Sequence, residues 1–241
     1  MNILVVNDDG IYAPGIEILA NAAAQLGRVW VVAPDQQCSA MSHKVTIGGS
    51  LKIEKVEDFP VPVEAAYKVS GSPADCVKVA LKYLLKEKPD FVFSGINNGY
   101  NVGCEIAYSG TMAAAMEAIM HGISAIAFSS TYNAPMTITE NYILDIARDL
   151  TEKEHNLTEV WNVNFPSTEK QVPKGILYDR SIAPVRLYDP FYKDTIHKDG
   201  SISLEIYGLP ITSTETVPTG TDMEAVLNGY ISIGKVRCSV L

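Results

Sequence analysis

The sequence has few of the features that mark secreted, membrane or nucleic-acid-binding proteins. Its four cysteines, at positions 38, 76, 104 and 238, form neither a CxxC pair nor a zinc-ligand spacing, so we expect reduced thiols in a cytoplasmic protein. Basic residues number 19 against 28 acidic ones, and the net charge of −9 argues against a non-specific nucleic-acid or membrane surface. The most apolar stretch, residues 112–128, is broken by Glu117 and His121 and is too short to span a bilayer comfortably.

The sequence also lacks a signal peptide and the common nucleotide-binding motifs. Asp8 and Asp9 interrupt any apolar segment near the start, so no signal peptide is expected. Neither a GxGxxG sequence nor a P-loop occurs, which weakens a dinucleotide-binding or kinase-type interpretation.

The first two-thirds of the chain alternates strand and helix signals. This order predicts an α/β fold, with a Rossmann-like, mostly parallel sheet and helices on both of its faces. Strands are expected at 3–6, 28–33, 91–93, 123–128 and 160–165, and helices from 14, 73, 111 and 136. Residues 44–57 and 63–70 are expected to be further strands, in a hairpin-like insertion around residues 58–60.

The pattern changes after Pro166. Residues 176–207 are rich in tyrosine and proline, and residues 201–207 alternate polar and apolar side chains as a strand does. Aromatic residues are numerous here for a solvated loop, which predicts a projecting β-extension that pairs with another subunit. The sequence Thr221 to Glu224 predicts a capping box for a last short helix. We therefore expect a catalytic core at 1–170 and a C-terminal extension of β-hairpin and short helix at 171–241, within a single domain.

Polar clusters follow three of the expected strands, at residues 8–10, 35–39 and 94–97. Because the carboxyl ends of parallel strands share one edge of the sheet, these clusters are expected to meet there. They supply two carboxylates (Asp8 and Asp9), the Ser39 hydroxyl and the Asn97 carboxamide. A donor set of oxygen alone favours Mg²⁺, Mn²⁺ or Ca²⁺ over zinc or copper.

A further polar element, residues 108–111, opens an alanine-rich helix. The free N–H groups and the dipole of a helix start suit an anion, and the hydroxyls of Ser109 and Thr111 add donors. Asn101 is placed to reach the same space. A metal site beside an anion site indicates phosphate-ester hydrolysis. Each cluster alone is more often a turn or a cap, and His43, a candidate general acid, is more often structural.

These segments together resemble the SurE survival-protein family of metal-dependent 5′/3′-nucleotidases. The matching segments are ILVVNDDGIYAPGI at 3–16, VVAPDQQCSAMSH at 31–43, SGSPADCVKVAL at 70–81, SGINNGYNVG at 94–103, YSGTMAAAMEA at 108–118, NVNFP at 162–166 and GTDMEAVLNGYISI at 220–233. The resemblance implies a Rossmann-like fold with a C-terminal extension exchanged between the subunits of a homodimer or homotetramer.

The same resemblance implies site residues. One divalent ion per subunit, Mn²⁺ or Mg²⁺, would be held by Asp8, Asp9, Ser39 and Asn97. The phosphate pocket would be lined by Asn101, Ser109, Gly110 and Thr111. The region 35–42 fits the family more loosely, because members often carry Arg or Gly around the serine.

The predicted function is therefore a metal-dependent phosphomonoesterase, a 5′-nucleotidase in which Asp8 and Asp9 take part in catalysis. Expected substrates are nucleoside 5′-monophosphates, with 3′-monophosphates and short polyphosphate as further ones. Three alternatives stay open. They are a nucleotide- or metal-binding protein without catalysis, an aspartyl-phosphate route through Asp8 or Asp9, and a carbohydrate-processing or transferase protein. The missing DxD pattern and the missing donor-nucleotide motif count against the last two.

Overall fold

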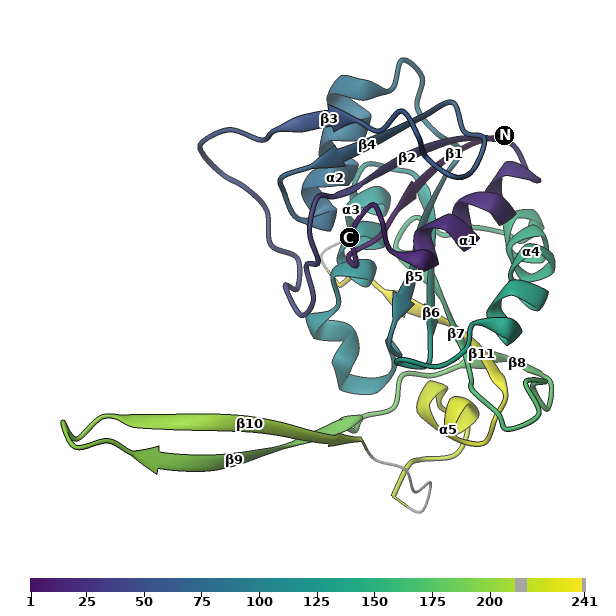
Figure 1. Cartoon of the computed structure of the whole chain (residues 1–241). Coiled ribbons are helices and arrows are strands. Elements are labelled where there is room, and N and C mark those ends of the chain that lie inside the picture. The colour runs from purple at the N-terminus through teal and green to yellow at the C-terminus, as the bar shows by residue number, and fades with distance from the viewer. Residues whose placement is uncertain (211–215, 240–241) are drawn as a thin grey trace.

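A nine-stranded sheet forms the centre of the fold, with strand order β3-β4-β2-β1-β5-β6-β7-β11-β8 (Figure 1). The computed structural model describes residues 1–210 and 216–239, and for residues 189, 190, 209 and 210 the backbone alone. Its strands are β1 (Asn2–Val6), β2 (Arg28–Pro34), β3 (Ile53–Lys55), β4 (Ala65–Val69), β5 (Phe91–Asn98), β6 (Ser124–Ser130), β7 (Glu159–Phe165), β8 (Ile176–Arg180) and β11 (Ile231–Arg237). Pairing is parallel except between β3 and β4 and between β7 and β11.

Helices cover both faces of this sheet. Along β1, Ile3 and Val5 pack on one face, with α1 (Pro14–Ala24) and α4 (Thr137–Glu152). Leu4 and Val6 pack on the other face, with α2 (Pro73–Val79) and α3 (Gly110–Met120). Both faces of the strand are apolar because both are buried, as in other parallel sheets. The predicted fold class is confirmed.

The helix starts follow their sequence signals to different extents. Ser72 accepts a hydrogen bond from the Asp75 N–H, and the Asp75 carboxylate accepts one from the Ser72 N–H, so α2 has a full capping box. Thr221 caps α5 (Asp222–Leu227) through the Glu224 N–H. The Glu224 carboxylate, however, accepts from the Gly220 N–H, so the capping box predicted there is only half formed.

Two predicted strand boundaries are wrong. Within residues 44–57 only β3 is a strand, because the earlier part is held by side chains: Thr46 bonds to the Asp75 carboxylate, and the Lys44 carbonyl accepts from Ser72. The strand expected at 91–93 continues through residues 94–98 as β5. Its end stays paired with β6 after a shift of register between Ser94 and Asn97.

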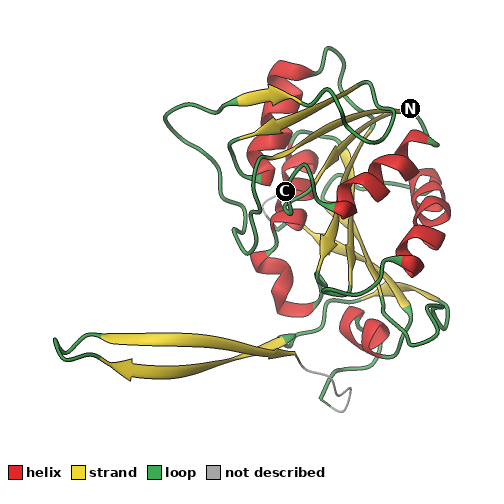
Figure 2. Ribbon diagram, viewed as in Figure 1, coloured by secondary structure: helices red, strands yellow, loops and turns green. Residues whose placement is uncertain are grey.

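The C-terminal part divides between the sheet and a projection. β8 and β11 join the nine-stranded sheet, whereas β9 (Tyr188–Ile196) and β10 (Ile202–Pro210) form an antiparallel hairpin that extends away from the body (Figures 1 and 2). The predicted extension at 171–241 includes residues 211–215 and 240–241, which lie outside the described residues. Across the described ranges, no helix has the length and apolar character needed to cross a membrane.

Two short helical segments adjoin longer helices. η1 (Ala80–Leu84) continues α2, and η2 (Gly103–Tyr108) leads directly into α3. Below η2, a small apolar cluster packs α5 against the start of the hairpin. Its buried members are Val102, Ala183, Leu187, Val217, Met223 and Val226.

Candidate functional site

The chain turns sharply at the C-terminal end of β1. The Asn7 side chain closes this turn, since its Nδ2 donates to the Gly10 carbonyl at 2.8 Å and its Oδ1 accepts from the Gly10 N–H at 3.2 Å. Gly10 has a φ of 100°, in the region that favours glycine. The turn therefore holds Asp8 and Asp9 at the edge of the sheet where ligands of open α/β folds bind.

Asp8 points toward the start of α3. The residue is 4% exposed, and its Oδ1 accepts a 2.6 Å hydrogen bond from the Thr111 hydroxyl. Burial, with a smaller contribution from the charge of Asp9, raises the pKa of the Asp8 carboxyl to about 6, against the lowering effect of the Thr111 hydrogen bond. A buried carboxylate of this kind is stabilised by a cation.

Asp9 bonds to different elements. Its Oδ1 accepts from the Gln37 side chain at 3.2 Å, and its Oδ2 accepts from the Asn98 N–H at 2.9 Å. The residue is half-buried, in contrast to Asp8. Gln37 and Asn98 were not among the predicted site residues, although each stands directly beside or close to one of them in the sequence.

Ser39 and Asn97 lie on the two segments that flank this turn. Ser39 is exposed and follows Cys38, whose N–H donates to the Asp8 carbonyl at 2.7 Å. Asn97 is half-buried on β5, next to β1 in the sheet, and its Nδ2 donates to the Gly99 carbonyl at 2.7 Å. This bond uses the amide nitrogen, so the carbonyl oxygen is the atom suited to a metal.

The start of α3 packs directly against Asp8. Ser109 caps the helix by accepting from the Met112 N–H at 3.0 Å, and the helical ladder begins with Ala113 N to Ser109 O. The N–H groups of Gly110 and Thr111 thus precede the ladder, as expected of an anion site. A Cβ on Gly110 would lie 2.8 Å from the Asp8 Cβ and 3.0 Å from its Oδ2, so only glycine permits this approach.

Asn101 belongs to a buried amide network. Its Nδ2 donates to the Ser129 hydroxyl at 2.8 Å, and its N–H donates to the Asn164 side chain at 2.9 Å. Its carbonyl accepts from the side chains of Asn162 and Asn164. The side chain is therefore engaged with β6, and its predicted place in a phosphate pocket stays a prediction.

A cavity of about 430 Å³ opens beside Asp9. Amide side chains from three segments reach it, those of Gln37, Asn98 and Asn133, and Ile96 and Met136 add apolar surface. Its volume lies within the range of roughly 300–1,000 Å³ found for small-molecule sites.

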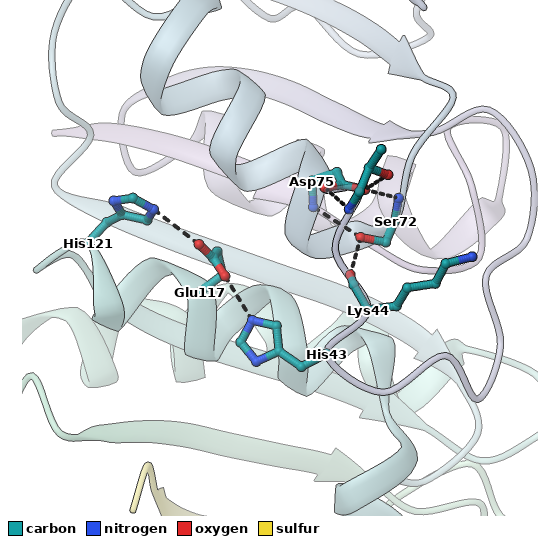
Figure 3. Close-up of polar contacts among 7 residues, drawn as sticks. His43, Lys44, Ser72, Asp75, Glu117 and His121 are labelled. Atoms are coloured by element: carbon teal, nitrogen blue, oxygen red, sulfur yellow. Dashed lines mark hydrogen bonds and ion pairs between the residues drawn. The ribbon is translucent and has the colours of Figure 1, made fainter. Parts of the chain in front are cut away.

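His43, the candidate general acid, is paired with Glu117 on α3. Its Nε2 lies 2.8 Å from the Glu117 Oε2, while the Nε2 of His121 lies 3.1 Å from the Oε1 (Figure 3). Glu117 was missed from the sequence because it lies inside an alanine-rich helix with no motif of its own. Burial raises its pKa, but the hydrogen bond from His43 and the nearby cations outweigh this, so the pKa is lowered overall.

The donor set fits a hard divalent cation. Among the described residues, no group of three or more His, Cys, Asp and Glu side chains is arranged to hold a metal. The set at this edge is instead two carboxylates with hydroxyl and amide oxygens, which suits Mg²⁺ or Mn²⁺ and leaves room for water and a phosphate. The close packing of Gly110 against buried Asp8 places the start of α3 beside these donors.

Comparisons with known proteins all point to one family. Residues 3–183 match the family described as Survival protein SurE. The 5′-nucleotidase SurE of Flavobacterium psychrophilum is 45% identical, with 98% of this chain and 91% of that protein covered. The 5′-nucleotidase SurE 1 of Thermus thermophilus is 39% identical, with 98% and 91% covered. The crystal structure of the SurE protein from Aquifex aeolicus superposes with a TM-score of 0.84 at 35% identity, over 100% of this chain and 95% of that one.

Proposed function

Because this chain belongs to the SurE survival-protein family, we infer that it is a 5′-nucleotidase, a phosphomonoesterase that converts nucleoside 5′-monophosphates to nucleoside and phosphate. The observation that carries this function is the contact between Asp8 and the start of α3, which sets a buried carboxylate beside free helix N–H groups. Nucleoside 3′-monophosphates and short polyphosphate are further substrates of the same phosphate site.

We propose that Asp8, Asp9, Ser39 and Asn97 hold one divalent cation per subunit, Mn²⁺ or Mg²⁺. The support is a set of oxygen donors from three segments that the sheet brings to one edge. When bound, such an ion supplies positive charge for the phosphoryl oxygens and lowers the pKa of nearby water.

The phosphate group is bound by the start of α3. Gly110 and Thr111 present N–H groups along the helix axis, where the dipole favours an anion. The hydroxyl of Ser109 and the side chain of Asn101 are further contacts of the phosphate in this proposal. The cavity beside Asp9 then receives the nucleoside, since it is lined by amide and apolar groups.

Asp9 is the better placed of the two carboxylates for moving a proton. Asp8 is buried and bonded to Thr111, whereas Asp9 is half-buried and lines the open cavity. Asp9 thus accepts a proton from attacking water or passes one to the leaving oxygen. The aspartyl-phosphate route requires a carboxylate oxygen in line with phosphorus. A phosphoenzyme trapped with a fluoride analogue and mapped to Asp8 or Asp9 would distinguish this route from direct attack by water.

The experiment that tests this function measures phosphate release from a panel of 5′- and 3′-nucleoside monophosphates and short polyphosphate. It is run with Mn²⁺, with Mg²⁺ and with EDTA, on wild type and on Asp9→Asn. Asp145→Asn is the control, because Asp145 is an exposed carboxylate on α4 whose partner is Arg148. We expect metal-dependent release that Asp9→Asn abolishes and Asp145→Asn preserves. Nucleotide binding without release under every metal condition would favour a non-catalytic binding protein.

The hairpin supports a homodimer or homotetramer. Directly opposed residues share one face of an antiparallel pair, and this register gathers most of the aliphatic side chains of the hairpin on one face. The hairpin's apolar face consists of Tyr192, Ile196, Ile202, Leu204 and Ile206, together with Asp194. These five apolar residues are 55–70% exposed in the single chain, as expected of a surface that a second subunit covers.

The cysteines are all free, in agreement with a cytoplasmic location.

A further inference from the structure

Glu117 joins two parts of the molecule that are far apart in the sequence. The residue is 7% exposed, and its two carboxylate oxygens face one histidine each. His121 lies at the end of α3, the helix that also carries Glu117. His43 instead belongs to the Ser39 loop, which we define as residues 35–46 (Figure 3). The contact between Glu117 and His43 therefore links the Ser39 loop to α3.

Other contacts restrict the Ser39 loop on both sides of Ser39. Before it, the Cys38 N–H donates to the Asp8 carbonyl. After it, the Ser42 N–H donates to the Tyr108 carbonyl at 3.0 Å, and the Ser42 hydroxyl donates to the Ala107 carbonyl at 2.6 Å. Both acceptors come immediately before the start of α3. Only three residues, 39–41, separate the two attachment points, so their positions determine where the Ser39 hydroxyl lies.

The far end of the loop is attached to α2. Ser72 donates to the Lys44 carbonyl at 2.5 Å (Figure 3). The Thr46 hydroxyl donates to the Asp75 carboxylate at 2.7 Å. These bonds belong to the helix cap of α2 and do not involve α3. His43 therefore supplies the charge-assisted contact that holds this loop to α3.

We propose that Glu117 is a positioning residue for the metal site, acting through His43 to hold the Ser39 loop against α3 and so to fix Ser39 relative to Asp8. The proposal rests on the proposed function, because it takes Ser39 as a metal ligand. It extends that function by naming the residue pair that orients one ligand. Outer-shell partners of this kind set the affinity of a site without touching the ion.

His121 provides a matched control for this pair. It contacts the same carboxylate as His43, and the two side chains are exposed to nearly the same degree, 28% and 30%. The histidines differ in the element that carries them: His43 lies in the Ser39 loop and His121 lies at the end of α3. Loss of His121 should therefore leave the Ser39 loop in place. Loss of His121 therefore reports any general effect of a weakened Glu117 environment.

The test measures Mn²⁺ binding to the full chain by titration calorimetry, together with activity at increasing Mn²⁺. The variants are His43→Ala, His43→Gln, Glu117→Gln, His121→Ala and Ser39→Ala. We expect His43→Ala to raise the Mn²⁺ dissociation constant about 10-fold. Its kcat at saturating Mn²⁺ should return close to the wild-type value. His43→Gln keeps a nitrogen donor in reach of Glu117 and should restore much of the affinity, whereas Glu117→Gln should weaken it and His121→Ala should not.

Several outcomes separate this proposal from the function on which it rests. If Ser39→Ala weakens Mn²⁺ binding but His43→Ala does not, the positioning role is wrong and the metal site stands. Equal losses in His43→Ala and His121→Ala would also overturn the positioning role, because they indicate a general loosening of α3. If wild type does not bind Mn²⁺, the proposed metal site is wrong, and the positioning role fails with it. If Ser39→Ala binds Mn²⁺ as tightly as wild type does, Ser39 is not a ligand, and the positioning role is wrong while the other ligands stand.

Discussion

Thr111 donates a 2.6 Å hydrogen bond to Oδ1 of Asp8, although the two residues are 103 positions apart in the sequence. The bond joins the end of the first strand to the first turn of α3, and Thr111 is fully buried. It stabilises the charged form of Asp8, the form that binds a cation, while burial acts in the opposite direction. This hydroxyl thus helps to orient Asp8 toward the start of α3.

Thr111→Val is expected to lower both stability and activity. Valine keeps the shape but leaves a buried carboxylate without its hydrogen bond, which costs about 1.5–3 kcal/mol in the free energy of unfolding. Activity should fall about 10–100-fold, because carboxylates that bind metals depend on such partners. Urea unfolding and phosphate release measure the two effects. Thr111→Ser retains the hydroxyl and should retain most of both; equal losses in the two variants would contradict the role of the bond.

Asp8 gives the metal-free protein a characteristic pH dependence. Burial raises its pKa from 3.8 to about 6 in the folded state, so the folded chain holds the proton more tightly than the unfolded chain. The resulting stabilisation is complete below pH 3.8 and is lost as pH rises through 6, a change of about 3 kcal/mol. In EDTA, Asp8→Asn should therefore gain stability relative to wild type as the pH rises from 4 to 8.

The measurement is the difference in unfolding free energy between Asp8→Asn and wild type, taken by denaturant titration at each pH in EDTA. Using the difference removes groups that titrate in both proteins. Addition of Mn²⁺ at pH 8 should stabilise wild type more than Asp8→Asn, since an opposite charge lowers the pKa of a carboxyl and binding stabilises the folded state. Parallel stability curves in EDTA would show that burial of Asp8 costs nothing.

Gly110→Ala tests the close approach of α3 to Asp8. Alanine normally stabilises a helix relative to glycine by about 1 kcal/mol. Here the added Cβ would lie 2.8 Å from the Asp8 Cβ and 3.2 Å from Pro73 Cγ, so we expect a loss of about 1–3 kcal/mol and weaker Mn²⁺ binding. Gly48→Ala is the control, because its Cβ would meet no atom within 4 Å. Thermal unfolding and Mn²⁺ titration of both variants provide the readout; a stabilised Gly110→Ala would refute the contact.

The fold was predictable where local pattern and burial agree. Residues 3–6 of β1, 29–34 of β2 and 125–128 of β6 are continuous apolar runs, and runs of this kind are typical of strands buried in a parallel sheet. The interval 44–52 shows the limit of this reasoning. Its residues Val45 to Ile47 favour a strand locally, but the bonds of Lys44 and Thr46 to Ser72 and Asp75 replace the ladder. Such bonds depend on tertiary neighbours that periodicity cannot reveal.

The candidate site was predictable as a location but not as a set of contacts. The topological rule for strand ends brought residues 8–10, 35–39 and 97 to one edge. It gave no information on which side chains bond to one another. Asp9 bonds to Gln37 and Asn98, and Glu117 bonds to the loop that carries Ser39. These pairings join segments through side-chain reach, which requires coordinates or covariation between positions.

The hairpin's apolar face should determine the oligomeric state. Replacing Ile196 and Ile206 by lysine places two charges on a surface that is 70% exposed at each position in the single chain, so the folded core should be unaffected. If a second subunit covers this face, burial of the unpaired lysines disfavours assembly, and light scattering after gel filtration should show a shift toward the monomer. Lysines at Thr195 and Ser203, on the opposite face of the same hairpin, add the same charge and should leave the mass unchanged. Loss of assembly in both pairs would point to the charge alone, and assembly in both would place the interface elsewhere.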